Sequence, residues 1–217
     1  MTVIGQKPPP KADSNIDKKA PRINIVPVDQ NTLAHITNAF PSHLREYAAL
    51  FVERTLPITF SSGSLIEVKI AGENLELPVR IYQQVDERVF KSLPVEAGTL
   101  YTCILTRHHD GYLRQRQLAN LFNQSQPWIV PFVILLASEY VIEMLYDIEK
   151  NFDHFDAGMY AQFLRENPAF YAKAKARMIS YWDCYYRWIF KYKNDYVGFR
   201  LFSRWDRLLE EPKKIFE

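Results

Sequence analysis

Three consecutive side chains, His108, His109 and Asp110, are the residues of this chain whose types best suit chemistry. Histidine nitrogens and carboxylate oxygens are common ligands of divalent metal ions, so the first interpretation is a metal site. The second is a turn between two helices, in which Asp110 accepts hydrogen bonds from amides at the start of the second helix. Gly111 favours such a turn because glycine adopts backbone angles that other residues rarely adopt. We favour the turn and keep the metal site as the alternative.

The dipeptide of His109 and Asp110 resembles the metal-binding HD motif of the helical phosphohydrolases of the HD superfamily. The resemblance implies a metal-dependent hydrolase in which His108, His109 and Asp110 help to hold a divalent ion. That pattern also requires an earlier histidine and a later aspartate. The earlier histidine could be His35 or His43, and the later aspartate could be Asp147, Asp153 or Asp156. No spacing singles out one residue in either set.

Glu139, Glu143 and Asp147 recur every four residues, which places three carboxylates on one face of a predicted helix. Di-iron bundles pair such glutamates with an ExxH motif, and this chain has none. We therefore expect an acidic face that is solvated or lies toward the basic C-terminal region. Glycine-rich phosphate loops, GxSxG and HExxH are absent from the sequence as well, so it nominates no catalytic residue and no cofactor.

The most informative predicted element is a helix from Pro168 to Lys193. At about 100° per residue, one side collects Ala174, Met178, Trp182, Tyr185 and Ile189, which we expect to pack inward. The opposite side and its boundary form the candidate binding surface, which consists of Lys173, Arg177, Tyr181, Arg187, Trp188 and Lys191. From Pro168 to the end of the chain, eleven Lys or Arg stand against six Asp or Glu.

Basic side chains beside Tyr and Trp are typical of macromolecular interfaces. We expect a non-enzymatic adaptor that binds a protein partner with an acidic surface through this helix. Nucleic-acid readers also combine cations with stacking rings, so single-stranded nucleic acid is a further alternative. The formal net charge of +2 for the whole chain does not by itself indicate nucleic-acid binding.

Composition limits the remaining classes. The 217 residues, 47% of them hydrophobic, suffice for one packed domain, and residues 1–21 predict a disordered basic arm. Cys103 and Cys184 have no CxxC spacing, which favours a reducing, cytoplasmic environment. The most apolar run, Trp128 to Ala137, is ten residues long, whereas a membrane span needs about 20.

Apolar periodicity predicts an α+β fold that is predominantly helical, with an N-terminal part (22–98) and a helical body (99–217). The N-terminal part holds a possible strand at Arg22 to Val28, two helices separated by Pro41, and a β-hairpin with its turn at Gly72 and Glu73. A third strand is expected from Ile58 to Phe60 or from Ile23 to Val28. The helices of the body are expected at Thr99 to His109, Tyr112 to Asn123, Pro127 to Lys150, Met159 to Glu166, Pro168 to Lys193 and Arg200 to Leu209.

Asp110 to Leu121 resembles the turn and second helix of a HEAT-type repeat, in which an acidic turn residue precedes an apolar residue and an arginine, here Leu113 and Arg114. The resemblance extends over Thr99 to Ile148 and implies that Pro127 to Leu145 form a second unit. Ile142 stands where that unit should have its arginine. A single long buried helix explains Pro127 to Lys150 equally well.

Overall fold

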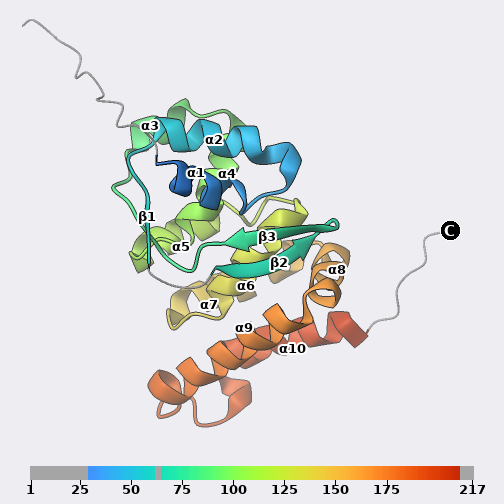
Figure 1. Ribbon diagram of the computed structural model, residues 1–217. Coiled ribbons are helices and arrows are strands. Elements are labelled where there is room, and N and C mark those ends of the chain that lie inside the picture. Colours follow the sequence, from blue (N-terminus) through green and yellow to red (C-terminus); the bar gives the residue numbers. More distant parts are fainter. Residues whose placement is uncertain (1–28, 62–64, 211–217) are drawn as a thin grey trace, which may run out of the picture.

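The computed structural model describes residues 29–61 and 65–210 (Figure 1). The predicted arm (1–21) and the possible strand at Arg22 to Val28 lie outside the described residues. The fold is α+β and predominantly helical, as predicted. The helices are α1 (Gln30–Thr37), α2 (Arg45–Arg54), α3 (Glu87–Ser92), α4 (Val95–Leu105), α5 (Gly111–Ala119), α6 (Val130–Ala137), α7 (Ile142–Asn151), α8 (Ala157–Glu166), α9 (Pro168–Tyr181) and α10 (Val197–Glu210). The strands are β1 (Thr59–Phe60), β2 (Ile66–Ile70), β3 (Glu73–Leu77) and β4 (Ile81–Tyr82).

The predicted pair of N-terminal helices is confirmed. The Asp29 carboxylate caps α1 by accepting from the Thr32 amide at 3.1 Å. After α1 the chain passes Pro41, makes a short helical turn at Ser42–Leu44 and continues into α2. Proline cannot donate the helical hydrogen bond, so the helix must restart beyond it.

The hairpin has the predicted inward face but a different register. Ile66 lies opposite Leu77 and Val68 opposite Leu75, whereas the predicted turn at Gly72 and Glu73 would pair Val68 with Leu77 and Ile70 with Leu75. The turn residues are Ala71 and Gly72, both with positive φ, and not Gly72 and Glu73. A two-residue turn with positive φ at both positions matches the twist of paired strands. The register error amounts to two residues, which preserves the side-chain alternation and hence the buried face.

A third strand does not join the hairpin in the described part of the chain. β1 pairs with β4 in a separate two-stranded sheet. β4 is also tied to the turn after α4, because the Ile81 amide donates to the Arg107 carbonyl and the His109 amide donates to the Ile81 carbonyl, both at 2.9 Å. These bonds bring the histidine pair beside β4.

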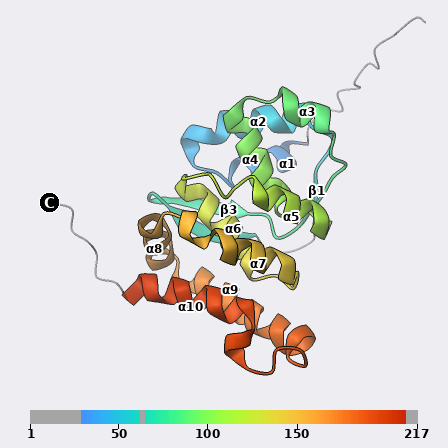
Figure 2. The same cartoon turned by 180° about the vertical axis from the view of Figure 1, so that it is seen from behind.

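The central helix, α6, is buried along its whole length. It contacts α7 and α9, while the hairpin contacts α8 and α9 (Figures 1 and 2). The prediction of one helix from Pro127 to Lys150 is wrong, since the chain turns between Ser138 and Val141. The Ser138 hydroxyl donates to the Leu135 carbonyl at 2.7 Å, and Val141 has extended backbone angles. The turn places Glu139 and Tyr140 beside other segments.

Candidate functional site

His108, His109 and Asp110 form the turn between α4 and α5, as the favoured interpretation predicted. Asp110 is the N-cap of α5, and its Oδ1 accepts from the Tyr112 amide at 2.9 Å. The rings of His108 and His109 contact each other, with centroids 4.3 Å apart, while Asp110 Oδ1 is engaged in the cap. His108 is buried, whereas His109 is exposed and stacks on Tyr82 with ring centroids 5.0 Å apart.

Both ring nitrogens of His108 are engaged. Its Nδ1 accepts from the Asp110 amide at 3.1 Å, and its Nε2 lies 2.9 Å from the Gln83 carbonyl. A nitrogen that accepts an amide hydrogen carries no proton, so Nε2 must be the protonated donor. The ring is thus held in one neutral tautomer, with no lone pair free to bind a metal ion. Among the described residues, His, Cys, Asp and Glu form no group of three or more that could hold a metal ion.

The environment of His108 predicts a pH-dependent stability. Burial lowers the pKa of His108 below its ordinary value of 6.5. The hydrogen bond to the Gln83 carbonyl raises the pKa, but burial has the larger effect. Near and below pH 6.5, His108 of the unfolded chain takes up a proton while His108 of the folded chain stays neutral. The contribution of His108 to stability is therefore complete above pH 6.5 and is lost as the pH falls from 6.5 through the lower pKa of the folded state. Urea unfolding between pH 7 and pH 5 should therefore show a decline that the His108→Gln variant reduces. The exposed His109→Gln is the control, and an unchanged slope for His108→Gln would contradict this assignment.

The main polar feature of the interior was not predicted. The Glu139 side chain is only 2% exposed and faces three guanidinium groups, those of Arg80, Arg107 and Arg114. Its Oε1 lies 3.1 Å from both Arg80 Nη2 and Arg107 Nη1, and its Oε2 lies 2.9 Å from Arg114 Nη2. We call these four residues the arginine cluster. Arg107 and Arg114 are fully buried, and Arg80 is a quarter exposed.

The electrostatics of the arginine cluster keep Glu139 ionised. Burial alone would raise the pKa of this carboxyl, but the three guanidinium groups outweigh burial and lower the pKa. Burial also lowers the pKa of Arg107 to about 10, although Glu139 opposes that shift. The predicted acidic face of Glu139, Glu143 and Asp147 is therefore wrong for Glu139, which lies in the turn before α7. Glu143 is exposed, and Asp147 accepts from Gln115 Nε2 at 2.8 Å.

The arginine cluster also joins distant segments. Arg107 donates to the Pro78 and Val79 carbonyls, at 3.3 and 2.7 Å, just after β3. Arg114 donates to the His108 and His109 carbonyls at 2.8 and 2.9 Å. The hairpin exit, the turn after α4 and the turn after α6 are thus fastened to one carboxylate. The next residue, Tyr140, is held at the surface as a result.

The predicted C-terminal helix from Pro168 to Lys193 is shorter than expected. α9 ends at Tyr181 and is followed by a π-helical turn, Trp182–Tyr186. The Arg187 amide donates to the Trp182 carbonyl, five residues back, at 2.8 Å. A π turn holds one residue more than an α turn, so every later side chain is rotated relative to the α-helical period. The inward face consequently passes from Trp182 to Tyr186 and Phe190, which pack on Tyr196.

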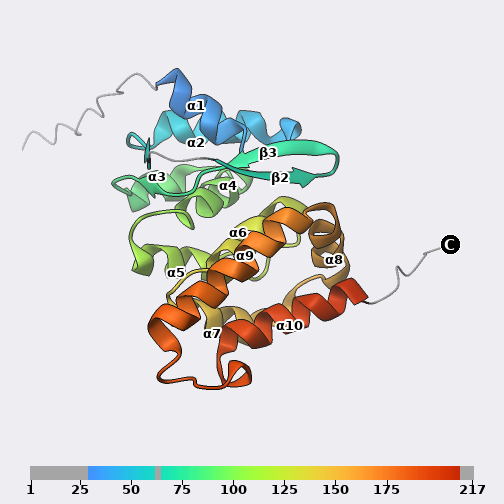
Figure 3. The same cartoon turned by 60° about the horizontal axis from the view of Figure 1, so that its bottom comes forward.

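This rotation reverses the predicted position of one ring and one aliphatic side chain. Tyr185 and Ile189 were expected to face inward, yet they are 61% and 72% exposed. Trp188 is 96% exposed and Tyr192 is 68% exposed. We call Tyr185, Trp188, Ile189 and Tyr192 the aromatic tip. It lies at the end of the molecule opposite α2 and α3 (Figures 1 and 3).

The predicted binding residues are only partly brought together. Arg187, Trp188 and Lys191 lie on the segment of the aromatic tip, where Lys193 adds a further exposed cation. Arg187 is paired with Asp183 at 2.7 Å and lies over the Trp182 ring. The other three lie on α9, where Lys173 is exposed and Arg177 and Tyr181 are half-buried. Tyr181 contacts the rings of Tyr140 and Tyr185.

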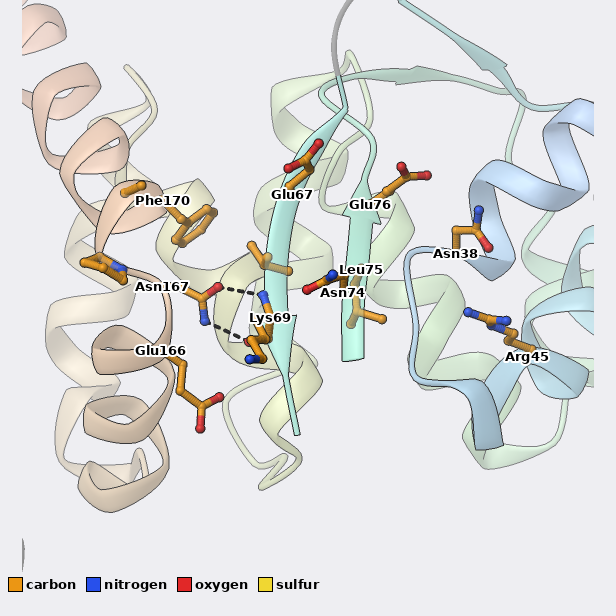
Figure 4. A pocket seen from close by; sticks show the side chains of 13 residues that line it. Asn38, Arg45, Glu67, Lys69, Asn74, Leu75, Glu76, Glu166, Asn167 and Phe170 are labelled. Atoms are coloured by element: carbon orange, nitrogen blue, oxygen red, sulfur yellow. Dashed lines mark hydrogen bonds between the residues drawn. The ribbon is translucent and has the colours of Figure 1, made fainter. Parts of the chain in front are cut away.

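A cavity of about 630 Å³ lies beside the hairpin (Figure 4). Asn167 stands directly before α9 but does not cap that helix with its side chain. Its Oδ1 accepts from the Lys69 amide at 2.6 Å, and its Nδ2 donates to the Lys69 carbonyl at 2.8 Å. The side chain therefore pairs with the edge of β2 as a further strand would. The charges that line this cavity are of both signs and do not define a ligand; they are Arg45, Glu67, Lys69, Glu76 and Glu166.

A second cavity, of about 580 Å³, lies between α3, α5 and His108. Its lining likewise mixes acids, cations and amides, with Phe90 and Leu113 as apolar parts. Because its charges are of both signs, this cavity does not identify a class of ligand either. Of the described helices, none is long and apolar enough to cross a membrane.

Sequence analysis predicted neither the burial of Glu139 nor the exposure of Tyr185 and Ile189. The available signal for Glu139 was its position directly after the apolar run of α6, which ends at Ala137. For Tyr185 and Ile189 no signal was available, because a π turn leaves no mark in a periodic pattern, whereas Trp188 had been placed on the binding surface from the sequence. Comparisons with protein-family models, with curated proteins and with solved structures found no match to this chain, so the HEAT-type resemblance stays a prediction.

Proposed function

We propose that this chain is a non-enzymatic adaptor that binds a protein partner with an acidic surface through the aromatic tip. The observation that supports this most is the near-complete exposure of Trp188 beside Tyr185, Ile189 and Tyr192. Large rings left in water are costly unless a partner covers them, and clusters of them mark interaction sites. Trp and Tyr are also the residues that contribute most to protein interfaces.

The charges around the aromatic tip favour an acidic partner. Lys191 and Lys193 are exposed and have no ion pair with any described residue, while Arg187 keeps a solvent-exposed pair with Asp183. Cations at the rim of an interface steer an acidic partner and accelerate association. We also propose a cytoplasmic location, which is supported by the two free thiols of Cys103 and Cys184.

The test compares two pairs of variants in a pull-down from cell lysate with quantitative mass spectrometry. Replacing Trp188 and Tyr192 by serine should lower the captured amount of each specific partner at least about tenfold. Truncating such a residue in an interface typically costs about 2 kcal/mol or more of binding free energy. Tyr112→Ser is the matched control, since Tyr112 is 83% exposed on α5, outside the aromatic tip.

A second pair of variants tests the charge. Lys191→Glu with Lys193→Glu should weaken the same partners, whereas Lys91→Glu on exposed α3 should not. Partners retained by the serine variant would refute the role of the aromatic tip. Binding of a labelled single-stranded oligonucleotide that weakens steeply with salt would assign the surface to nucleic acid instead.

A further inference from the structure

The arginine cluster carries more positive charge than its carboxylate balances. Three guanidinium groups face Glu139 alone, which leaves the cluster with an excess of two positive charges, although Arg80 is a quarter exposed. Unbalanced buried charge is costly because it is removed from water without a counterion. Backbone carbonyls accept hydrogen bonds from Arg80, Arg107 and Arg114, but these dipoles are neutral. The interior is thus arranged to favour a further negative charge nearby.

Arg177 adds a fourth positive charge to the same region. It lies on α9, which packs against α6, and its charge is close enough to lower the pKa of Arg107. It is one helical turn before Tyr181, whose ring contacts Tyr140, the residue after Glu139. Arg177 is half-buried and has no hydrogen bond or ion pair with any other described residue. A cation in this position is repelled by the arginine cluster and lacks an acid of its own.

The available donors suit an oxyanion. The whole guanidinium fork of Arg177 is unused, and Arg114 Nε is buried with no acceptor among the described residues. Guanidinium groups bind phosphate and carboxylate oxygens through paired, charge-assisted hydrogen bonds. With Arg177 included, four positive charges stand against one negative charge, an excess of three. A dianion offsets this excess better than a monovalent carboxylate does.

We propose that Arg177, backed by the arginine cluster, binds the phosphate monoester of a partner beside Tyr140 and Tyr181. The site lies next to the aromatic tip, because Tyr181 and Tyr140 both contact the ring of Tyr185. The inference rests on the proposed function for the identity of the partner, which would be an acidic protein carrying a phosphorylated side chain. Phosphate binding itself is measured on the chain alone.

The experiment is isothermal titration of the full chain with methyl phosphate, inorganic phosphate, dimethyl phosphate and acetate at equal ionic strength. Methyl phosphate should bind the parent chain, and dimethyl phosphate and acetate should bind it at least about tenfold more weakly. The affinity of the Arg177→Gln variant for methyl phosphate should fall by a similar factor. Lys173→Gln is the matched control, being an exposed cation one turn earlier on α9. Binding of inorganic phosphate with exclusion of methyl phosphate would overturn the assignment to an ester.

A second measurement guards against misfolding of the variant. Without phosphate, Arg177→Gln should melt at the same or a higher temperature than the parent chain, because one repelled charge is removed. A lower melting temperature, or methyl phosphate affinity equal to the parent's, would overturn the proposal. The serine variant at Trp188 and Tyr192 should keep its methyl phosphate affinity while losing its partners. Failure of the phosphate site is thereby distinguished from failure of the aromatic tip.

Discussion

Replacing Glu139 by glutamine is expected to lower the free energy of unfolding by about 3–5 kcal/mol. Glutamine has nearly the same shape, so the substitution removes the negative charge without creating a cavity. The guanidinium groups of Arg80, Arg107 and Arg114 would then be left in the interior without a counterion. Breaking a buried charge network by removing one member costs more than the network contributes, because the remaining charges stay out of water.

Guanidinium chloride unfolding followed by circular dichroism gives the free energy. Glu143→Gln is the matched control, since Glu143 is exposed at the start of α7, and its effect should stay within about 0.5 kcal/mol. Combining Glu139→Gln with Arg107→Met should lower the free energy of unfolding by less than the sum of the two single variants. The double variant removes the carboxylate together with one of the guanidinium groups that would otherwise lack a counterion. A loss below 1 kcal/mol for Glu139→Gln would mean that water or an ion balances the arginine cluster.

Replacing Asn167 by alanine is expected to lower the free energy of unfolding by about 3 kcal/mol. The amide makes three hydrogen bonds, to the Lys69 amide, the Lys69 carbonyl and the Phe163 carbonyl. Its side chain is 6% exposed, so water cannot readily replace these bonds. The two Lys69 groups belong to the edge of β2 and would lose the partner that joins the hairpin to the corner between α8 and α9 (Figure 4).

Asn74→Ala, at an exposed position of β3, is the control and should change stability by no more than about 0.5 kcal/mol. Amide hydrogen exchange separates a local from a global effect: the Lys69 amide should lose protection in Asn167→Ala more than amides of α6 do. If the Lys69 amide stays as protected as in the parent chain, the bond to Asn167 contributes little to the hairpin's attachment.

These two polar anchors have a common role in positioning the candidate interaction surface. Glu139 holds the turn that carries Tyr140, and Tyr140 contacts the rings of Tyr181 and Tyr185. Asn167 attaches the start of α9 to the hairpin, and α9 leads directly into the aromatic tip. Variants of either anchor are therefore expected to weaken partner binding without altering a residue of the tip.

Local patterns in the sequence predicted most of the helices and the hairpin because these depend on near neighbours. Apolar spacing revealed the helical body, while Asp29 and Asp110 cap α1 and α5 through bonds within three residues. Alternation revealed which face of the hairpin is buried, although it left the register open, since a shift of two residues buries the same side chains. The positive φ of Ala71 could not be predicted from the sequence, because glycine is the residue normally expected at such a turn position.

Only the tertiary structure decided where the charges and the rings of the candidate sites lie. Glu139 pairs with arginines 25 to 59 residues away in the chain, and no spacing encodes such pairings. The aromatic tip depends on one π turn, which shifts Tyr185 and Ile189 from the expected buried face to the surface. Sequence alone therefore determined most of the elements, which short-range hydrogen bonds and apolar periodicity dictate, but not the breaks after α6 and α9. The sites arose from long-range contacts, because burial and charge balance are settled only when distant segments pack together.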